Sequence, residues 1–406
     1  MGLRARCMRF LDRGNGSGVW QIRCETGDES ARACVSCGCV CRVRTSRERT
    51  VVHVPLGSDA IHLKVRVCTY ECVTCARMWH DDLKALVSGR TLLSRAAVDW
   101  ALRRVALESA SISACARTLG CSWNALDRAV RAHGMRILSR SDPYARVTRI
   151  GVDEHVWRHG ASGDRYVTVI VDLTPRADGA PARLLDMVPG RSAQAFANWL
   201  EARGACFRDR VEVVAMDAFS GWKQAAARML AHAVEVIDPF HVVHLAAGRL
   251  TMVRCRLQRE ATGRRGVKGE RLYDCRRALL KTASLRTPRQ RERVDTLLAD
   301  PVNDALRLAH GAYQRIIACY RHKDPRLGRR MMGALIDALA EPAATRRCPE
   351  LRSLGRTLKR RRADILAYFT HQHSSNGPTE AINGRLETLR GIAMGFDNFE
   401  HYRQRS

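Results

Sequence analysis

The sequence is poor in acidic residues and lacks any long apolar segment. Its 41 Asp and Glu residues stand against 69 Lys and Arg, which gives a formal net charge of +28 and an isoelectric point near 10.3. Such an excess of positive charge is expected of a protein that neutralises phosphate groups, so we predict nucleic acid as the partner. No stretch approaches the roughly 18–20 uninterrupted apolar residues of a membrane-spanning helix, so we expect no membrane partner.

The N-terminus also lacks the features of a secretory signal. It begins MGLRARCMRFLDRG, which is basic but contains neither a continuous apolar core nor a small-residue cleavage site. We therefore expect a cytoplasmic protein, associated with the nucleoid of a bacterial cell. In a reducing compartment its 16 cysteines should be metal ligands or buried thiols, not disulfides. The 406 residues are enough for two or three domains without such cross-links.

Two CxxC pairs predict a zinc ribbon in residues 1–87. Cys34 and Cys37 are followed by a glycine, and Cys72 and Cys75 follow two strand-like runs, RTVVHVPL and IHLKVRV. Two such knuckles on short strands can bring four thiolates to one tetrahedral Zn²⁺ ion, with the glycine permitting a tight turn. In a segment too small for its own hydrophobic core, a structural Zn²⁺ supplies folding energy.

The other cysteines leave the exact zinc ligands open. Cys39, Cys41 and Cys68 are close enough in sequence to replace a knuckle cysteine. Five more are scattered among apolar or basic neighbours, and we expect them to be simple buried or surface thiols. These five are Cys206, Cys255, Cys275, Cys319 and Cys348.

Residues 88–140 are predicted to form a helix-turn-helix domain. Apolar residues recur every three or four positions in SRAAVDWALRRVALES, and a second helical run, SISACARTLGCSWNALDRAVRAHG, breaks at Gly120. Small Ala116 where the helices touch, a glycine in the turn, and apolar Leu126 and Ala129 on the back of the second helix form the pattern of a DNA-binding helix-turn-helix. A plain two-helix hairpin is the alternative.

The second helix of this motif would present its first turns to DNA. Ser122 can cap the helix, which leaves Trp123, Asn124, Asp127 and Arg128 on the outward face. We therefore predict that Ser122, Trp123, Asn124 and Arg128 contact DNA. Asn pairs with adenine and Arg with guanine when these side chains reach base edges.

After a polar, proline-containing linker the pattern changes to strands. Three candidate strands, VTRIGVDEHVW, RYVTVIVDLTP and ARLLDMVPG, precede a helical run, SAQAFANWLEARG. A strand (VEVVAMDAFSGW), a helix (KQAAARMLAHA) and a last strand (VEVIDPF) follow. The order βββαβαβ predicts a ribonuclease H-like α/β core, whose first part we assign to residues 145–248.

A long basic segment then interrupts the strands. Residues 249–370 have a helical pattern and basic runs such as ATGRRGVKGER, RTPRQRERV and LGRTLKRRR. These runs are either solvated helix faces or a track along a DNA duplex. We expect an α-helical insertion here, after which residues 371–406 supply the end of the α/β core.

Two aspartates follow strands that should be neighbours. In a ribonuclease H-like sheet the first and fourth strands lie side by side, so Asp153 in IGVDEH and Asp217 in VAMDAF would converge. Carboxylates that hold two divalent ions about 3.5–4 Å apart can catalyse phosphodiester cleavage. Both residues follow apolar runs, where an unpaired carboxylate is costly unless a cation balances it.

Other carboxylates compete for these roles. Glu154 is adjacent to Asp153, but strand alternation allows only one of the two to face a metal. Asp217 could instead cap the helix that follows its strand. Asp172 and Asp238 are better explained as turn residues.

A third acid is predicted in NGPTEAINGRLETLRG, near the C-terminus. Glu380 would lie in the first turn of a helix whose preceding loop could pack against the sheet. Glu387, seven residues later on nearly the same helical face, is its rival. Simple capping is the other explanation, because Pro378 suits the start of a helix and the helix dipole favours an acid there.

Six segments together resemble the DDE insertion-sequence transposases of the ISL-three family. They are IGVDEHVWRHG, YVTVIVDLTP, LLDMVPGRSAQAFANWL, VEVVAMDAFSGW, VIDPFHVVHLA and NGPTEAINGRLETLRGIAMGFDNFEHYR. The resemblance covers essentially the whole chain, with the zinc ribbon and the helix-turn-helix in the family's order.

The resemblance implies a recombinase that binds the inverted repeats at the ends of its own mobile element and cuts and rejoins DNA with Mg²⁺ or Mn²⁺. Carried over residue by residue, the metal-binding DDE triad is Asp153, Asp217 and Glu380, and the basic helical segment is an insertion before the Glu. The expected partners are double-stranded DNA and a second copy of the chain, because paired-end reactions require two active sites. No small-molecule substrate is expected.

Two departures from the family pattern keep alternatives open. The segment from Cys34 to Cys41 is richer in cysteine than the usual knuckle, and the chain stops at HYRQRS, soon after the last motif. A catalytically inactive or truncated transposase-derived DNA-binding protein is one alternative. A nuclease without joining activity is another.

Overall fold

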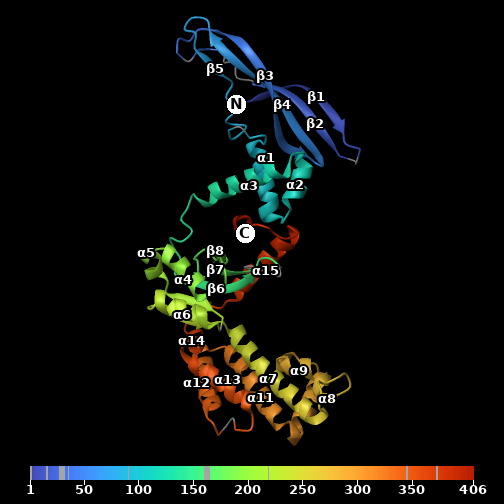
Figure 1. Ribbon diagram of the computed structural model, residues 1–406, viewed down its shortest axis with the longest axis vertical. Helices are drawn as coiled ribbons and strands as arrows, with labels where there is room; N and C mark the ends of the chain where they lie inside the picture. Colours follow the sequence, from blue (N-terminus) through green and yellow to red (C-terminus); the bar gives the residue numbers. More distant parts are fainter. Residues whose placement is uncertain are drawn as a thin grey trace. The chain divides into compact units, whose positions relative to one another are not determined.

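The chain folds into two compact units, each with one five-stranded sheet (Figure 1). The first unit comprises residues 1–142 with 388–406, and the second comprises residues 143–387. The computed structural model describes residues 2–14, 17–26, 33–34, 36–89, 91–159, 165–217, 219–343, 346–371 and 374–406. Over these ranges no helix has both the length and the apolar content needed to cross a membrane.

The sheet of the first unit is built on a long hairpin. β3 (Cys41–Leu56) and β4 (Asp59–Cys72) pair antiparallel, and Gly57 in the turn between them has a φ of 61°. The strand-like runs that separate the two CxxC pairs lie in β3 and β4, as predicted. The remaining strands are β1 (Leu3–Asp12), β2 (Gly18–Thr26) and β5 (Met78–His80), and β2 runs parallel to β4.

Three helices of the same unit share an apolar core with Val52 of β3. They are α1 (Arg95–Leu107), α2 (Ile112–Leu119) and α3 (Trp123–Leu138). Gly120 ends α2 with a φ of 66°, a conformation that favours glycine. Ser122 caps α3, because its hydroxyl accepts a hydrogen bond from the backbone N–H of Ala125 at 3.3 Å. The predicted turn glycine and helix cap are therefore confirmed.

One residue of α3 does not lie where the sequence predicts. Asp127 is expected on the outward face, but it is only 3% exposed. Its carboxylate accepts a hydrogen bond from Arg131 at 2.9 Å and lies 2.9 Å from Nε2 of His401 in α16 (Phe399–Arg405). The prediction for Asp127 was wrong because a helix from the far end of the chain packs on this side of α3.

The second unit contains a mixed sheet with strand order β10-β9-β6-β7-β8. Its strands are β6 (Arg149–Val156), β7 (Tyr166–Asp172), β8 (Arg183–Pro189), β9 (Val213–Met216) and β10 (Val234–Ile237). The first three form an antiparallel meander, whereas β9 is parallel to both β6 and β10. The predicted succession of strands is confirmed, and the first and fourth strands are neighbours as expected.

Two helices bury the apolar face of this sheet. α4 (Ala193–Ala202) and α6 (Ser220–Met229) pack side by side, and α5 (Ala205–Arg210) follows α4. Val152 and Met216 are fully buried in the same cluster as the aromatic residues of these helices. Because side chains alternate along a strand, the residues that follow Val152 and Met216 point to the other face.

The last helix of the second unit, α15 (Gly377–Ile392), packs closely on the opposite side of β6 (Figure 1). A Cβ atom placed on Gly151 would lie 2.5 Å from Oγ1 of Thr379 and 3.1 Å from Oδ1 of Asn376. Only glycine at this strand position allows the start of α15 to approach so closely. The sheet therefore fixes where the first turn of α15 lies.

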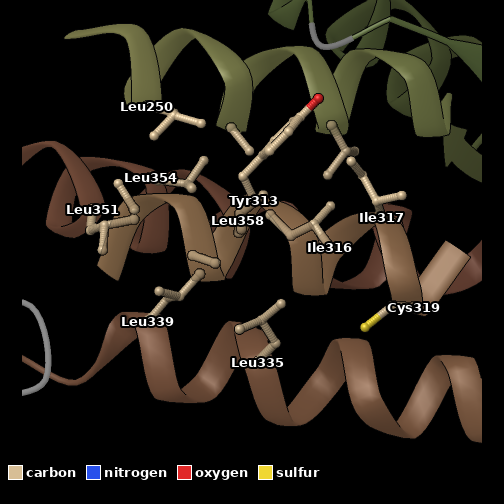
Figure 2. Packing of buried hydrophobic residues seen from close by; sticks show 14 of the residues in the cluster. Leu250, Tyr313, Ile316, Ile317, Cys319, Leu335, Leu339, Leu351, Leu354 and Leu358 are labelled. Atoms are coloured by element: carbon tan, nitrogen blue, oxygen red, sulfur yellow. The ribbon is translucent and has the colours of Figure 1, made fainter. Parts of the chain in front are cut away.

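The segment between β10 and α15 is helical, and its helices share one apolar core. The helices are α7 (Pro239–Thr262), α8 (Arg271–Asp274), α9 (Arg276–Leu280), α10 (Pro288–Ala299), α11 (Asp304–Tyr320), α12 (Pro325–Ala340), α13 (Pro349–Arg360) and α14 (Arg362–Ala367). Figure 2 shows Leu250, Ile316, Leu335 and Leu354, from four different helices, pointing toward one another. This bundle carries the basic runs that the sequence places in the insertion.

An ionic cluster joins the helical segment to the sheet region. Nζ of Lys223 in α6 lies 2.6 Å from both Glu235 of β10 and Asp364 of α14. Arg361 also pairs with Asp364, at 2.6 Å. Asp364 is buried, so removing either cation would leave a charge with fewer partners away from solvent.

Candidate functional site

Three aspartates form a row at one edge of the second sheet. In the parallel register, Val152 of β6 and Ile237 of β10 both lie opposite Met216 of β9. The next residue along each strand is an aspartate: Asp153, Asp217 and Asp238. The carboxyl ends of parallel strands are where ligands bind in open α/β sheets, so this row is the first candidate site.

The charge of Asp153 is poorly compensated by its surroundings. The residue is 8% exposed, and burial raises the pKa of its carboxyl group to about 6, with the negative charges of Asp217 and Glu380 adding to the increase. Its Oδ2 accepts a hydrogen bond from the Asn383 side-chain amide at 3.0 Å. Because both carboxylates influence Asp153, the strand edge and α15 contribute to one electrostatic site.

Asp217 has similar surroundings. Burial raises the pKa of its carboxyl group, and the charge of Glu154 raises it further. The opposing influences are the backbone N–H of Phe219, which donates to Oδ1 at 2.7 Å, and the positive charges of His241 and Arg361. Arg361 belongs to the helical segment, so that segment also acts on the charge at the strand edge.

A cluster that sequence reasoning missed lies beside this row. Ligand atoms of Asp238, His241 and Glu380 all lie within 4.8 Å of one another. Asp238 is the cap of α7, since its carboxylate accepts from Phe240 N at 2.9 Å, but it also accepts from Asn376 N at 2.8 Å. The explanation of Asp238 as a turn residue is thus incomplete. A signal was present in the sequence, because an Asp and a His three residues apart at a helix start share one face.

His241 balances some of the negative charge in this cluster. Its Nδ1 lies 3.6 Å from Oδ2 of Asp238, which is longer than a hydrogen bond, and is buried without a hydrogen-bond partner among the described residues. The carboxylate of Asp238 is the main cause that raises the pKa of His241, and Asp217 and Asp153 add to it. The raised pKa favours the protonated form of His241, whose positive charge lies near the three aspartates.

The competing carboxylates lie in other surroundings. Glu154 is exposed and pairs with Arg191 at 3.1 Å. Asp172 is buried, which raises the pKa of its carboxyl group, but hydrogen bonds from the Thr174 hydroxyl and backbone N–H lower the pKa. Ion pairs with Arg176 at 2.9 Å and Arg183 at 3.1 Å lower it further, so that it lies below its ordinary value. Glu387 is exposed, two turns further along α15 than Glu380. The structure therefore groups Glu380, and not Glu387, with Asp238 and His241.

The donor set at the strand edge suits a divalent cation. Carboxylate and amide oxygens are the ligands that Mg²⁺ and Mn²⁺ prefer. Buried Oδ1 atoms of Asn376 and Asn383 have no hydrogen-bond partner within the described parts of the chain. Buried acids with raised pKa values and unpartnered carbonyl oxygens both indicate a missing positive charge.

A second candidate site consists of four cysteines in the first unit. The Sγ atoms of Cys34, Cys37, Cys72 and Cys75 lie within 4.8 Å of one another. The separations are 3.5 Å for Cys34–Cys75, 3.4 Å for Cys37–Cys72 and 3.8 Å for Cys37–Cys75. A tetrahedral Zn²⁺ with Zn–S bonds of about 2.3 Å requires sulfur atoms roughly 3.8 Å apart. The thiols therefore fit one zinc ion.

The two knuckles have matching backbone geometry. Gly38 N donates to Cys34 O at 2.8 Å, and Ala76 N donates to Cys72 O at 3.0 Å. Both residues have positive φ, 71° for Gly38 and 54° for Ala76. In the second knuckle, the backbone N–H groups of Cys75 and then Thr74 lower the pKa of the Cys72 thiol to about 6, which favours the thiolate that binds metal.

The three rival cysteines are not part of this four-sulfur group. Sγ of Cys39 donates to the carbonyl of Cys37 at 3.7 Å, and Sγ of Cys41 donates to the carbonyl of Cys39 at 3.4 Å. Burial raises the pKa of Cys41 to about 11, so it is a poor thiolate. Cys68 lies four residues before Cys72 on β4. The tetrad of the two CxxC pairs is thus the most compact set among the described residues.

The residues predicted to contact DNA are exposed at the start of α3. Ser122, Asn124 and Arg128 are exposed, and Trp123 is 41% exposed. His401 of α16 contacts the Trp123 ring edge-on, with ring centroids 5.9 Å apart. The first turn of α3 is therefore accessible to a large partner, although α16 covers part of its flank.

The sequence matches a family and curated relatives. A family model described as a transposase, of the DDE type and the ISL-three group, matches residues 150–406. The transposase for insertion sequence element IS1557 of Mycobacterium tuberculosis is 28% identical to this chain over 309 residues, with the same figures in two strains. That match covers 70% of this chain and 66% of the relative, just under two thirds of the relative's length.

Proposed function

Because this chain belongs to the ISL-three family of DDE transposases, we propose that it binds the terminal inverted repeats of an insertion sequence and catalyses metal-dependent cleavage and transfer of DNA strands. The observation that carries the proposal is the alignment of Asp153 and Asp217 at one sheet edge, with Glu380 close enough to raise the pKa of Asp153. The strand order also suits a ribonuclease H-like core, which we propose for residues 145–248 and 371–406.

The proposed active site uses Asp153, Asp217 and Glu380 as ligands for divalent ions. Two Mg²⁺ or Mn²⁺ ions bound there would supply activation of the attacking oxygen and stabilisation of the leaving oxygen. Asn383 holds the carboxylate of Asp153 in position by its hydrogen bond of 3.0 Å. Asp238 and His241 lie beside Glu380, where they can position its carboxylate or serve as further ligands. Of these acidic and histidine groups, only Asp238, His241 and Glu380 already have ligand atoms within 4.8 Å of one another in the described part of the chain, so ion binding would draw Asp153 and Asp217 closer to Glu380.

The proposed DNA-binding region is the first unit. A zinc ribbon in residues 1–87, closed by Cys34, Cys37, Cys72 and Cys75, would support the helix-turn-helix of residues 88–140. Ser122, Trp123, Asn124 and Arg128 are exposed at the start of α3, where a recognition helix contacts base edges. The basic helical insertion, residues 249–370, would contact phosphates. Pairing of the two transposon ends would involve two copies of the chain.

Cleavage of a labelled DNA fragment bearing one end of the element tests the catalytic assignment. The parent protein should cleave it only with Mg²⁺ or Mn²⁺, and Glu380→Gln should lower the rate by at least about 10²–10³-fold, the usual cost of removing a residue that stabilises developing charge. Glu387→Gln is the matched control, because it removes the same charge two turns further along the same helix. Glu387→Gln should retain the parent rate.

The opposite outcome would reassign the site. If Glu387→Gln abolished cleavage and Glu380→Gln did not, the third acid would be Glu387. If the parent protein bound the fragment but never cut it with any divalent ion, the chain would be a DNA-binding protein derived from a transposase. Products that end at cleavage, without joining to a second DNA, would indicate a nuclease.

A filter-binding titration tests the DNA-binding assignment. Arg128→Ala should weaken binding of the element end and lower the slope of log affinity against log salt if Arg128 contacts a phosphate. If it reads a guanine, the loss should be about 1–3 kcal/mol and specific to one base pair. Unchanged affinity and specificity would remove Arg128 from the interface.

A further inference from the structure

A pocket in the second unit has no assigned role, and two of its lining residues, Pro239 and Phe240, stand between Asp238 and His241 in the chain. Its volume is about 230 Å³. Its lining includes Phe240 and Val243 of α7, Thr282, Tyr313 and Tyr320 of α11, and Arg321. We call this the aromatic pocket. Tyr313 of α11 faces α7 across the bundle (Figure 2).

Phe240 is an unusual residue to leave exposed in this position. It follows Asp238 by two residues and precedes His241, yet it is 56% exposed. His244 stacks on its ring with centroids 5.9 Å apart and an interplanar angle of 25°, and His241 contacts it edge-on at 5.6 Å. Covering an exposed Phe side chain is favourable, so an aromatic surface flanked by two imidazole rings suits a planar ligand.

Tyr320, which carries a buried hydroxyl group, is also among the residues that line the pocket. Its ring is fixed by Phe369, stacked at 5.3 Å and 2°, and by Tyr368, edge-on at 5.5 Å. Its hydroxyl oxygen is buried and has no hydrogen-bond partner in the described part of the protein. A buried hydroxyl without a partner is costly, and a ligand with a hydrogen-bonding edge that reached it would recover that cost.

Arg321 supplies a positive charge at the rim. Its side chain is exposed, and no ion pair with a carboxylate is found for it among the described residues. The chain carries a net charge of +28, so an anionic partner is expected throughout. A flat aromatic face, a hydrogen-bonding hydroxyl and a guanidinium group together match a base, its edge and its phosphate.

We propose that the aromatic pocket receives one unpaired nucleotide of the DNA substrate, next to the bond that is cleaved. Phe240 stacks on the base, the hydroxyl of Tyr320 bonds to its edge, and Arg321 contacts its phosphate. The assignment rests on the proposed cleavage activity, because Pro239 and Phe240 of the pocket stand between Asp238 and His241 in the chain. Removing a base from a duplex costs free energy, and stacking of that base on an aromatic side chain returns part of the cost.

Permanganate reactivity of thymine tests the proposal without relying on catalysis. Permanganate oxidises thymines that are not stacked in a duplex. Fragments bearing one element end, with thymine placed in turn at each position around the cleavage site, are bound to protein that carries Glu380→Gln so that the DNA stays intact. We expect one position to become at least about fivefold more reactive on binding, a change that reports loss of stacking at that base.

Three further substitutions, each combined with Glu380→Gln, distinguish loss of base stacking from a general loss of protein structure. Phe240→Leu keeps an apolar side chain but removes the ring, so the hyperreactive position should return to the free-DNA level. Phe240→Trp keeps an aromatic face and should retain it. Met252→Leu is the matched control, since Met252 lies on the same helix, is 50% exposed and is outside the pocket. DNA affinity, measured in parallel, should change less than twofold for Met252→Leu.

Each other outcome counts against the proposal. Equal hyperreactivity in Phe240→Leu and the unmodified background would assign the unstacked base to another site. If no position became hyperreactive, although the parent protein with Glu380 cleaves the same fragment, the pocket proposal would be overturned. The cleavage function would still stand. A protein that neither binds nor cleaves the fragment would overturn the proposed function, and the pocket assignment with it.

Discussion

The cysteine tetrad and the row of aspartates are two candidate metal sites that the chain builds in opposite ways. The most widely spaced thiols in contact, those of Cys34 and Cys75, are 41 residues apart. The hydrogen bond from Asn383 to Asp153 spans 230 residues. The cysteine site is formed by local turns, whereas the row of aspartates depends on the register of a sheet and on a helix distant in sequence.

The two sites also differ in what holds them together without an ion. Among the described residues the knuckles are closed by their own turns, by hydrogen bonds such as Gly38 N to Cys34 O, and by the strand pairing of Cys41 with Cys72. The aspartates stand on strands buried in a core with α4 and α6. We infer that at the cysteine site the metal stabilises the surrounding structure, whereas at the acidic site the structure holds carboxylates together against their repulsion.

The largest effect that follows concerns the cysteine tetrad. Cys72→Ser should remove zinc from the protein and destroy amide-exchange protection in β3 and β4 near the knuckles. Structural zinc binding is worth on the order of 10–16 kcal/mol of apparent free energy in small zinc domains, and three ligands rarely suffice. Zinc content by atomic absorption and hydrogen exchange by mass spectrometry measure the two losses.

Cys39→Ser is the matched control for this prediction. Cys39 lies within the same cysteine-rich segment but outside the four-sulfur group. It should keep one zinc ion per chain and the parent exchange pattern. Loss of zinc in Cys39→Ser, with retention in Cys72→Ser, would show that the ligand set differs from the two CxxC pairs.

The next prediction concerns the carboxyl group of Asp153, whose negative charge lowers the stability of the metal-free protein. The pKa of its carboxyl group in the folded protein is about 6, above the ordinary value of 3.8. A raised pKa means that the folded state binds the proton more tightly, so the stabilisation is complete below pH 3.8 and is lost as the pH rises through 6. The difference corresponds to about 3 kcal/mol for the metal-free second unit.

Denaturant unfolding between pH 4 and pH 8 measures this dependence. In EDTA, Asp153→Asn should flatten that part of the pH profile and raise the free energy of unfolding at pH 8. With Mg²⁺ present the parent protein should gain stability at pH 8 and little at pH 5, because protons compete with the ion. A parent protein whose metal-free stability did not fall between pH 4 and pH 8 would contradict the arrangement of charges described here.

The contrast between the sites explains how far the sequence could predict them. The CxxC spacing places two thiols on one turn, so each half of the cysteine site follows from local geometry, although Cys39, Cys41 and Cys68 leave the exact ligand set open at the level of sequence. The strand succession from β6 to β10 is also readable, because apolar runs and turn residues alternate there. Both predictions depend on neighbours within a few residues.

Other features depend on contacts that no local pattern reports. Asp127 is buried by His401, a residue 274 positions away. Asp238 and His241 are close in sequence, but Glu380 joins them only because α15 packs over Gly151. A local pattern identifies Asp238 as a turn residue, which is correct for its backbone hydrogen bond to Phe240 but says nothing about its distant neighbours.

A smaller effect tests the long-range contact that holds α15 on the sheet. Gly151→Ala should destabilise the second unit by about 1–3 kcal/mol, the usual cost of overpacking, because the new methyl group would lie 2.5 Å from Oγ1 of Thr379. Cleavage should fall more steeply than stability, since a displaced α15 carries Glu380 away from Asp153. Denaturant unfolding and the cleavage assay give the two values.

Gly248→Ala is the control for the glycine substitution. Gly248 lies within α7, and outside its chain neighbours and its own helical backbone no described atom lies within 4 Å of the position where its Cβ would be. Replacing glycine by alanine inside a helix stabilises it by roughly 0.5–1 kcal/mol. If Gly151→Ala were as well tolerated as Gly248→Ala, then α15 would not pack on β6 as closely as described.

The smallest expected effect is the change in stability when glycine and alanine are exchanged at equivalent positions of the two knuckles. Gly38 and Ala76 occupy equivalent positions with positive φ, but only the glycine adopts this conformation without strain. The left-handed region costs an alanine roughly 1–2 kcal/mol, and glycine loses about 0.4–1 kcal/mol more entropy on folding. Ala76→Gly should therefore stabilise the zinc-loaded first unit by about 0.5–1 kcal/mol, and Gly38→Ala should destabilise it by a similar amount.

Competition with a zinc chelator can resolve a difference of this size, because 1.4 kcal/mol is about tenfold in affinity. If both knuckles close on one ion, relieving the strain at Ala76 should raise zinc affinity by roughly twofold to fivefold, while Gly38→Ala should lower it. Equal affinities in the two variants and the parent would mean that the turns form independently of the metal. The cysteine site would then resemble the acidic site, where the fold positions the ligands before any ion binds.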